Sequence, residues 1–281
     1  MTAKQQRFDE LLREMGSVLV AYSGGVDSAY LALRAHQVLG ARALAVTAVS
    51  ESLAGWQRAF AEDVARRFGF AHRLVRTSEL DNPQYARNAA DRCLHCKTEL
   101  FETLLPLARA EGLAHVAYGV IVDDLQDYRP GQRAAAAAGV RGPLAEAGMT
   151  KADVRACSRE LSLPSWDLPA SPCLSSRVAY GIPVTARVLR GVERAEDGLR
   201  ALGFRELRVR HLGEGRARVE IGLAEMPRLG DPVLLGQALA SVRAAGYAIV
   251  DIDPAGYRRG RLNEALGPEV VSGVSSTHGA P

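Results

Sequence analysis

Along the first 161 positions, short apolar segments alternate with longer segments in which apolar residues recur at helical spacing. The apolar segments, which predict strands, are 17–22, 43–49, 71–76 and 115–119. The periodic segments, which predict helices, are 1–15, 28–39, 56–68, 97–111 and 151–161. Alternation of this kind is typical of an α/β fold whose parallel sheet is covered by helices on both faces.

The pattern changes after residue 161. Residues 162–184 are rich in proline and serine and predict a functional loop. Beyond the loop, the pattern predicts helices at 185–202 and 231–245 and strands at 205–212, 216–222 and 247–252, the first two of which suggest a hairpin around Gly213–Gly215. We therefore expect four parts, which are a first domain at 1–165, the loop at 166–184, an α+β domain at 185–268 and a disordered tail at 269–281.

Charge and composition narrow the classes of function. The formal net charge is +3, which is too small to argue for a nucleic-acid partner, and only three of the 35 basic residues are lysines. A membrane-spanning helix needs about 20 consecutive apolar residues, and no such run occurs. Since the first residues are also charged and polar, we expect a cytoplasmic protein without a membrane partner.

The string Ser-Gly-Gly-Val-Asp-Ser at 23–28 follows the first predicted strand and opens the next helix. Gly24 and Gly25 permit a tight turn and the close approach of a ligand. Ser23 and Ser28 offer hydroxyl groups, and Asp27 offers a carboxylate. Because a helix N-terminus favours bound phosphate, this order of strand, loop and helix predicts a phosphate cradle.

This cradle lacks the Gly-Lys step of the Walker type, because no Gly-Lys dipeptide occurs in the chain. It resembles the PP-loop of the ATP pyrophosphatases, which split ATP between the α- and β-phosphates. Other residues at predicted strand ends then become candidates for the nucleotide site. Ser50 and Asp124 are assigned to it, and Arg129 near the same edge is assigned to phosphate.

Three cysteines fall in motifs that suggest the handling of sulfur. Cys93 and Cys96 form a C-x-x-C step, and Cys173 lies in a proline-bent loop beside Arg177. Three thiolates can hold a [4Fe-4S] cluster with one iron left open. Alternatively, the thiolate of Cys173 can attack an adenylated substrate directly. The residues by themselves leave both readings open.

Together these motifs make the chain resemble the LarE-type ATP-dependent sulfur transferases, from about residue 16 to residue 267. The strings that carry the resemblance are SGGVDS (23–28), DRCLHCKTELF (91–101), DDLQDYRPG (123–131), PLAEAGMTKADVR (143–155), LPSWDLPASPCLSSRVAYG (163–181) and GYRRGRLNEAL (256–266). The family pattern has an Asn where this chain has Ile121, which puts one polar contact near the nucleotide in doubt.

The resemblance implies an activity. ATP and Mg²⁺ would adenylate the carboxylates of pyridinium-3,5-biscarboxylic acid mononucleotide, and sulfur would then replace AMP to give the thiocarboxylate ligand of the nickel-pincer cofactor of lactate racemase. Cys173 aligns with the cysteine that donates its own sulfur in the sacrificial version. Members with the extra C-x-x-C instead use a [4Fe-4S] cluster, and the presence of Cys93, Cys96 and Cys173 favours this version here.

Three further expectations concern partners. Arg208 and Arg210, two positions apart on a predicted strand, share one face and are assigned with Arg177 to the substrate. The resemblance also implies a symmetric homo-oligomer, for which we expect a hexamer. Another PP-loop adenylating enzyme, either a tRNA-thiolating enzyme or an amide-forming synthetase, is the alternative, although neither a basic RNA-binding surface nor a glutaminase region is evident.

Overall fold

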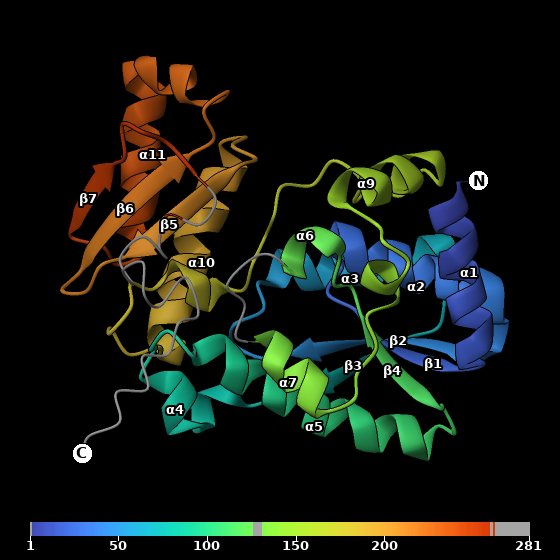
Figure 1. Ribbon diagram of the computed structural model, residues 1–281. Helices are drawn as coiled ribbons and strands as arrows, with labels where there is room; N and C mark the ends of the chain where they lie inside the picture. The colour runs from blue at the N-terminus through green and yellow to red at the C-terminus, as the bar shows by residue number, and fades with distance from the viewer. Residues whose placement is uncertain (1, 126–130, 259–260, 262–281) are drawn as a thin grey trace, which may run out of the picture. The chain divides into compact units, whose positions relative to one another are not determined.

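The structure is a computed structural model that describes residues 2–125, 131–258 and 261 of the 281-residue chain (Figure 1). The chain divides into two compact units. Unit 1 comprises Met1–Glu79 and Cys93–Ser171, and unit 2 comprises Leu80–Arg92 and Pro172–Pro281. The passage from unit 1 to unit 2 at Ser171–Pro172 falls within the segment 166–184 that the sequence predicts as a loop. The proposed division into domains, loop and tail stays a prediction, and residues 269–281 lie outside the described residues.

Unit 1 contains a four-stranded parallel sheet, which confirms the predicted fold class. Its strands are β1 (Val18–Ala21), β2 (Ala43–Val49), β3 (His72–Arg76) and β4 (His115–Tyr118). They are arranged in the order β3-β2-β1-β4, and Val18 of β1 pairs with Ala43 on one side and His115 on the other. The chain therefore moves outward from β1 to β3 and returns to the far side of β1. Ligands of open α/β sheets bind beyond the carboxyl ends of the strands at such a reversal. In this sheet the reversal lies at β1, so a ligand is expected beyond the carboxyl end of β1.

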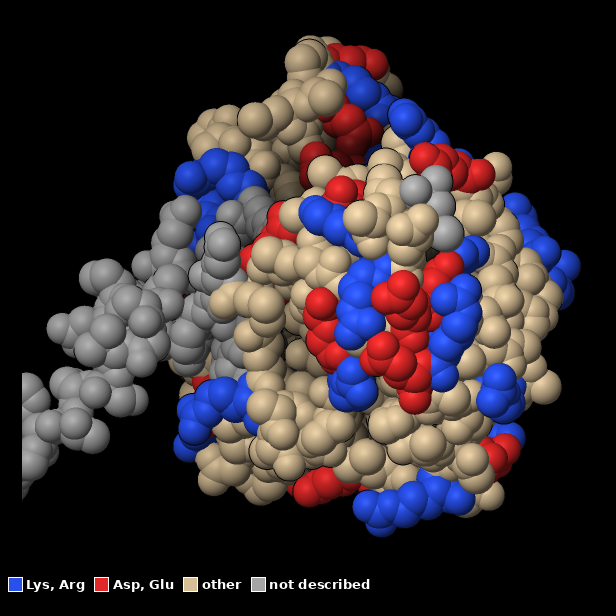
Figure 2. Space-filling model, turned by 45° about the vertical axis from the view of Figure 1, so that its right-hand side comes forward, with Lys and Arg blue, Asp and Glu red and all other residues tan. Residues whose placement is uncertain are grey.

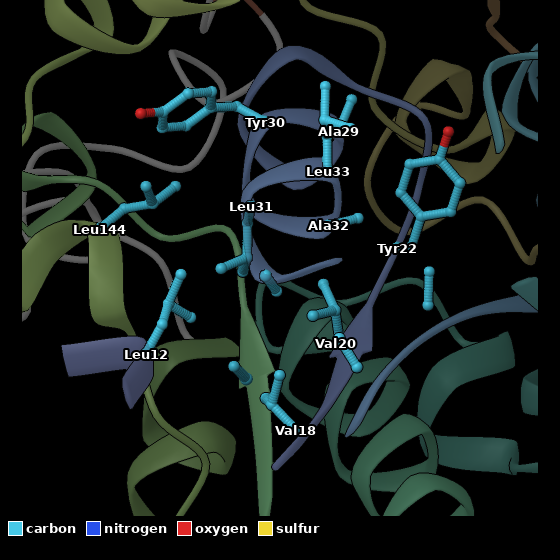
Figure 3. Packing of buried hydrophobic residues seen from close by; sticks show 14 of the residues in the cluster. Leu12, Val18, Val20, Tyr22, Ala29, Tyr30, Leu31, Ala32, Leu33 and Leu144 are labelled. Carbon is cyan, nitrogen blue, oxygen red and sulfur yellow. The ribbon is translucent and has the colours of Figure 1, made fainter. Parts of the chain in front are cut away.

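Helices cover both faces of this sheet (Figure 1). One face is covered by α1 (Ala3–Met15), α2 (Val26–Leu39) and α3 (Gly55–Phe68), with α9 (Lys151–Glu160) packed against α2, and the other by α5 (Arg92–Ala110) and α7 (Gly131–Ala137). Side chains alternate along β1, so Val18 and Val20 point towards Leu31 of α2 (Figure 3), whereas Leu19 packs with Phe101 of α5. The remaining helical turns are η1 (Gly40–Arg42), α6 (Val122–Leu125) and α8 (Pro143–Glu146).

Most predicted elements are confirmed to within two residues of their ends. The clearest difference is α5, which begins at Arg92 and not at residue 97. Its first turns therefore include Cys93 and Cys96, which the sequence placed before the helix. The Gly-free run from Arg92 to Ala110 has no residue that would stop a helix before Pro106, and Pro106 itself is accommodated inside it.

Unit 2 is an α+β unit built on a three-stranded sheet in the order β5-β6-β7. Strands β5 (Leu207–His211) and β6 (Arg216–Ile221) form the predicted antiparallel hairpin, and β7 (Ile249–Ile252) runs parallel to β6. Helices α10 (Ala186–Ala201) and α11 (Pro232–Ala244) pack together and against the sheet. Shorter turns are η2 (Glu79–Asp81), α4 (Pro83–Ala86), η3 (Leu174–Arg177) and η4 (Met226–Gly230). None of the helices described in either unit is both long and apolar enough to cross a bilayer.

Candidate functional site

The loop between β1 and α2 forms a turn that is braced by hydrogen bonds between its own residues. Gly24 has a φ of +76°, and Gly25 is the N-cap of α2. Among the described residues no side chain caps this helix end, so the amide groups of its first turn remain available to an anion. Ser28 Oγ accepts from the Ser23 amide at 3.1 Å and lies 3.0 Å from Ser23 Oγ. The two serines therefore hold the loop in shape, and Ser23 is exposed at its rim.

Neighbouring backbone approaches this loop closely. A Cβ on Gly24 would lie 3.0 Å from Ala61 Cβ of α3, and a Cβ on Gly119 would lie 2.8 Å from the Ser28 amide nitrogen. Gly119 directly follows β4, the strand that pairs with β1. The end of β4 is thus packed against the first turn of α2, and a larger residue at 119 would displace the loop.

Asp27 forms an ion pair with a lysine that sequence reasoning missed. Lys151 Nζ, at the start of α9, lies 2.5 Å from Asp27 Oδ2. Burial raises the pKa of Asp27, and the charge of nearby Asp124 raises it further, while Lys151 lowers it. No other described residue bonds to Asp27 Oδ1, although that atom is buried. Asp27 and Asp124, both assigned to the nucleotide from sequence, are therefore brought close enough to interact electrostatically.

A second lysine, Lys97 of α5, was also missed. Its Nζ lies 5.8 Å from the ring centres of both Phe101 and Tyr118, the last residue of β4. Composition could have pointed to these residues, because the chain has only three lysines against a large excess of arginine. Two of the three occupy the carboxyl edge of the sheet, where a lysine offers phosphate a compact positive charge.

Ser50 follows β2 and lies in a polar recess at the same edge. A cavity of about 290 Å³ is lined there by Val49, Ser50, Glu51, Arg76, Thr77 and Ser78. Beside it, the buried Glu79 carboxylate accepts hydrogen bonds from Ser50 Oγ at 2.6 Å, from Thr77 Oγ1 at 3.2 Å and from Ser52 Oγ. Since β2 pairs with β1, this recess and the loop at 23–28 share one edge of unit 1. Arg129, also assigned to the nucleotide from sequence, lies outside the described residues.

In unit 2, Cys173 is half-buried and immediately precedes η3. The loop that carries it is held by Arg177, whose Nη1 donates to the carbonyl oxygens of Pro172 at 2.5 Å and Cys173 at 3.1 Å. Arg177 Nε donates to Glu196 Oε1 at 2.8 Å, and only 1% of the Arg177 side chain is exposed. Burial by itself would raise the pKa of Glu196, but Arg177, Arg208 and Arg200 outweigh burial and lower that pKa to about 2.

Arg208 and Arg210 share one face of β5, as predicted, and are brought close to the cysteine-bearing loop. Arg210 donates to Glu220 Oε2 at 2.7 and 3.0 Å and to the Ser176 carbonyl oxygen at 2.9 Å. Arg208 stacks on Tyr257 with its guanidinium 4.6 Å from the ring centre. Burial, followed by the charge of Arg177, lowers the pKa of Arg208 to about 10. Unit 2 therefore places three buried arginines beside the loop of Cys173, two of them paired with the buried carboxylates of Glu196 and Glu220. The assignment of these arginines to a substrate stays a prediction.

Cys93 and Cys96 lie one helical turn apart on α5, with Cys93 exposed and Cys96 half-buried. They belong to unit 1, whereas Cys173 belongs to unit 2. Within the part of the chain that the structure describes, no three His, Cys, Asp or Glu side chains are grouped as metal ligands. A site shared by the three cysteines therefore stays a prediction.

Surface charge bears on the RNA-thiolating alternative. On the face in Figure 2, Lys and Arg side chains are interspersed with Asp and Glu side chains and do not form a continuous basic surface. Ion pairs at the surface include Arg7 with Glu14 at 2.8 Å and Arg87 with Asp91 at 2.9 Å. This face has no broad basic patch of the kind that binds a nucleic-acid backbone.

Comparisons with known proteins give two long matches. No protein-family model matches the chain. It is 44% identical over 266 residues to an uncharacterised protein of Synechocystis sp., covering 95% of this chain and 99% of that protein. It is 34% identical over 268 residues to the pyridinium-3,5-bisthiocarboxylic acid mononucleotide synthase of Lactiplantibacillus plantarum, covering 95% of this chain and 96% of that enzyme. An uncharacterised Methanocaldococcus jannaschii protein is 25% identical over 193 residues.

Proposed function

The chain belongs to the LarE-type sulfur transferases, the family of the pyridinium-3,5-bisthiocarboxylic acid mononucleotide synthase, and we propose that it performs the sulfur transfer of nickel-pincer cofactor synthesis. Its substrate would be pyridinium-3,5-biscarboxylic acid mononucleotide, whose carboxylates are adenylated and then converted to thiocarboxylates. The observation that carries this proposal is the 34% identity over nearly the full length of both chains.

The first step uses unit 1. A substrate carboxylate oxygen attacks the α-phosphorus of ATP, the bond to the β-phosphate breaks, and diphosphate leaves. The turn at Ser23–Ser28 supports this role because its uncapped amide groups and the N-terminal dipole of α2 favour bound phosphate. The recess beside Ser50, at the same edge of the sheet, offers space and polar groups for the nucleoside of ATP.

Asp27 and Asp124 would hold the Mg²⁺ that accompanies ATP. Their carboxylates repel one another, and Asp27 Oδ1 has no bonding partner among the described residues. A divalent cation between the two carboxylates would offset their repulsion and would give Asp27 Oδ1 a partner. Carboxylate oxygens are the ligands that Mg²⁺ prefers. When bound, the ion would offset the negative charge of the phosphates. Lys151 would then be available to bond to phosphate oxygen.

The second step uses unit 2. In the sacrificial version, the Cys173 thiolate attacks the adenylated carbon and AMP leaves. Loss of the Cα proton of Cys173 and cleavage of its Cβ–Sγ bond then yield the thiocarboxylate and leave dehydroalanine. The bonds from Arg177 to the carbonyl groups of Pro172 and Cys173 fix the backbone that carries the thiol, which supports an attack from a defined direction.

In the cluster version, Cys93, Cys96 and Cys173 would hold a [4Fe-4S] cluster, which supplies sulfide in place of the Cys173 sulfur atom. The donor set suits this group in kind, because all three residues are cysteines and none of them is fully buried. Arg92, the residue directly before Cys93, donates to the carbonyl oxygen of Ser175, two positions after Cys173. This bond lies within unit 2, and the sharing of a cluster by the three cysteines rests on the family resemblance.

Arg208 and Arg210 would bind the substrate phosphate through charge-assisted hydrogen bonds. Arg208 supports this assignment best, because it is buried and stacks on Tyr257, whereas Arg210 already pairs with the buried Glu220. Arg177 was assigned to the same set from sequence. Its bonds to Glu196 and to two loop carbonyl groups support a contribution through the position of the loop. We further propose that the protein is cytoplasmic and that it forms a homo-oligomer. Sedimentation of the purified protein would test the oligomeric state.

The proposal is tested by product analysis. Purified protein is given ATP, Mg²⁺ and the pyridinium dicarboxylate, and the nucleotide and pyridinium products are separated by mass spectrometry. We expect AMP, diphosphate and a thiocarboxylate in matched amounts, and no AMP when the dicarboxylate is omitted. Release of ADP and phosphate, or AMP formation without any sulfur incorporation by intact protein, would overturn it.

A further inference from the structure

The segment Leu80–Arg92 lies between β3 and α5 in the chain but belongs to unit 2. At its centre is Asn88, which is fully buried and has a φ of +59°. Non-glycine residues rarely adopt this backbone conformation, and Asn is one of the few that tolerate it. A buried, polar residue in a strained conformation is retained where its bonds require that geometry.

Those bonds lead to the chain that follows Cys173. Asn88 Nδ2 lies within hydrogen-bond distance of three backbone carbonyl oxygens, those of Val178 at 3.3 Å, Ala179 at 2.8 Å and Ile182 at 2.9 Å. The Asn88 carbonyl oxygen accepts in turn from the Gly181 amide at 3.2 Å. One residue therefore both donates to the loop and accepts from it, at four of the five positions from 178 to 182.

Two neighbours extend this contact towards the cysteine. Arg92 Nη1 donates to Asn88 Oδ1 and, at 2.8 Å, to the Ser175 carbonyl oxygen. Tyr85 OH lies 2.6 Å from Ser175 Oγ, and both residues are buried. Arg177 holds the carbonyl groups of Pro172 and Cys173, so the backbone is bonded at and before Cys173 by one set of groups and after it by another.

We propose that Asn88, supported by Tyr85 and Arg92, is a positioning residue for sulfur transfer. It holds the loop 173–182 so that the Cys173 thiol stays in one place. An amide side chain suits the task because its two N–H groups and one oxygen can serve carbonyl acceptors and a guanidinium donor together. The inference rests on the proposed role of Cys173 as the sulfur-bearing residue. Its structural claim is that Asn88 keeps the loop 173–182 ordered, and this claim can be measured without the activity.

The test compares three variants of the full chain. Asn88→Asp keeps the oxygen that accepts from Arg92 and removes the N–H donors, and Asn88→Gly keeps the positive φ and removes the side chain. Asn82→Asp is the matched control, because Asn82 caps α4 in the same segment through its oxygen alone. Alkylation of Cys173 by iodoacetamide, followed by peptide mass spectrometry, and hydrogen exchange of the amides of 173–182 report loop order without any enzyme assay.

We expect both Asn88 variants to alkylate at Cys173 about tenfold faster, as the loss of more than one buried hydrogen bond implies, and to lose protection in 173–182. Thiocarboxylate formation should slow by a similar factor while ATP affinity stays unchanged, and Asn82→Asp should match the parent protein. Unchanged alkylation and exchange in both variants would overturn the inference. If neither variant folds, Tyr85→Phe, which removes one hydroxyl group, is tested by the same two measurements. Faster alkylation of Cys173 and lower protection of 173–182 would support the inference, and no change in either would overturn it. Because these readouts need no turnover, they decide even if the proposed activity fails.

Discussion

Lys151 Nζ lies 2.5 Å from Asp27 Oδ2, although 124 positions separate the two residues in the chain. Asp27 belongs to the loop that opens α2, and Lys151 is the first residue of α9, which packs against α2. The pair is partly shielded from water, with a third or less of either side chain exposed. It joins the predicted phosphate cradle to a helix that had no assigned function.

Replacement of this lysine should weaken nucleotide binding. Lys151→Met removes the cation that bonds to Asp27 and takes a positive charge from the proposed phosphate site. We expect ATP affinity to fall about tenfold, a typical value for one charge-assisted contact, with a partial recovery in Lys151→Arg. Titration calorimetry at a fixed Mg²⁺ concentration measures the ATP affinity of each variant. Lys4→Met is the control, because Lys4 pairs with Asp153 in an exposed position. Equal ATP affinity in all three variants would contradict the assignment.

The source of the transferred sulfur is decided by two substitutions. Cys173→Ser should bind ATP but form no thiocarboxylate in either version. If the cluster version holds, anaerobically purified protein absorbs broadly in the visible range, and Cys93→Ala loses that absorption. A colourless protein in which Cys173 loses the mass of H₂S after one turnover would instead establish the sacrificial version. Intact-protein mass spectrometry and absorption spectra distinguish the two.

Glu196 should stabilise unit 2 at neutral pH. Its pKa is about 2 in the folded protein against an ordinary 4.5, so its contribution is complete above pH 4.5 and is lost as the pH falls from 4.5 towards 2. The shift corresponds to about 3 kcal/mol. Glu196→Gln should therefore cost about 3 kcal/mol or more at pH 7, since it leaves Arg177 buried beside a neutral group.

Hydrogen exchange of the α10 and β5 amides measures this effect as a function of pH. Asp197→Asn on the same helix is the control, since Asp197 is exposed and pairs with Arg200 at the surface; its effect should stay below about 1 kcal/mol. A Glu196→Gln variant that is as stable as the parent at pH 7 would show that the buried carboxylate is not ionised there.

Gly119 should be required for the shape of the phosphate loop. A methyl group at this position would lie 2.8 Å from the Ser28 amide nitrogen and 3.1 Å from the Asp27 carbonyl carbon. Both are backbone atoms, so Gly119→Ala must shift the first turn of α2, and we expect ATP affinity to fall about tenfold or more. Gly236→Ala in α11 is the control, because that methyl group meets nothing within 4 Å. Unchanged affinity in Gly119→Ala would show that the loop adapts.

Local pattern was sufficient for most of the fold. Consecutive residues encode the strand that ends at Ala21, the glycine turn after it and the helix that follows. The structure confirms all three. The start of α5 was missed because the segment 92–96 was interpreted as a C-x-x-C motif and not as part of a helix, although Asp91 directly before it is of a type that often caps helices. Lys151 and Lys97 were missed for another reason. Asp27, which pairs with Lys151, and Tyr118, one of the two rings beside Lys97, lie on other elements, and spacing along the chain says nothing about such pairs.

By itself, the sequence determined the parallel α/β unit, the glycine turn at 23–28 and the following α+β unit, because apolar periodicity and glycine placement act over a few neighbouring residues. The family followed from the resemblance of its motif strings, which the 34% identity confirms. Only the tertiary structure decided which charges meet. It paired Asp27 with Lys151 and Arg177 with Glu196, and it folded Asn88 onto the loop after Cys173. These contacts join residues that are 19 or more positions apart in the chain, and they form only because the packing of helices and strands brings those residues together.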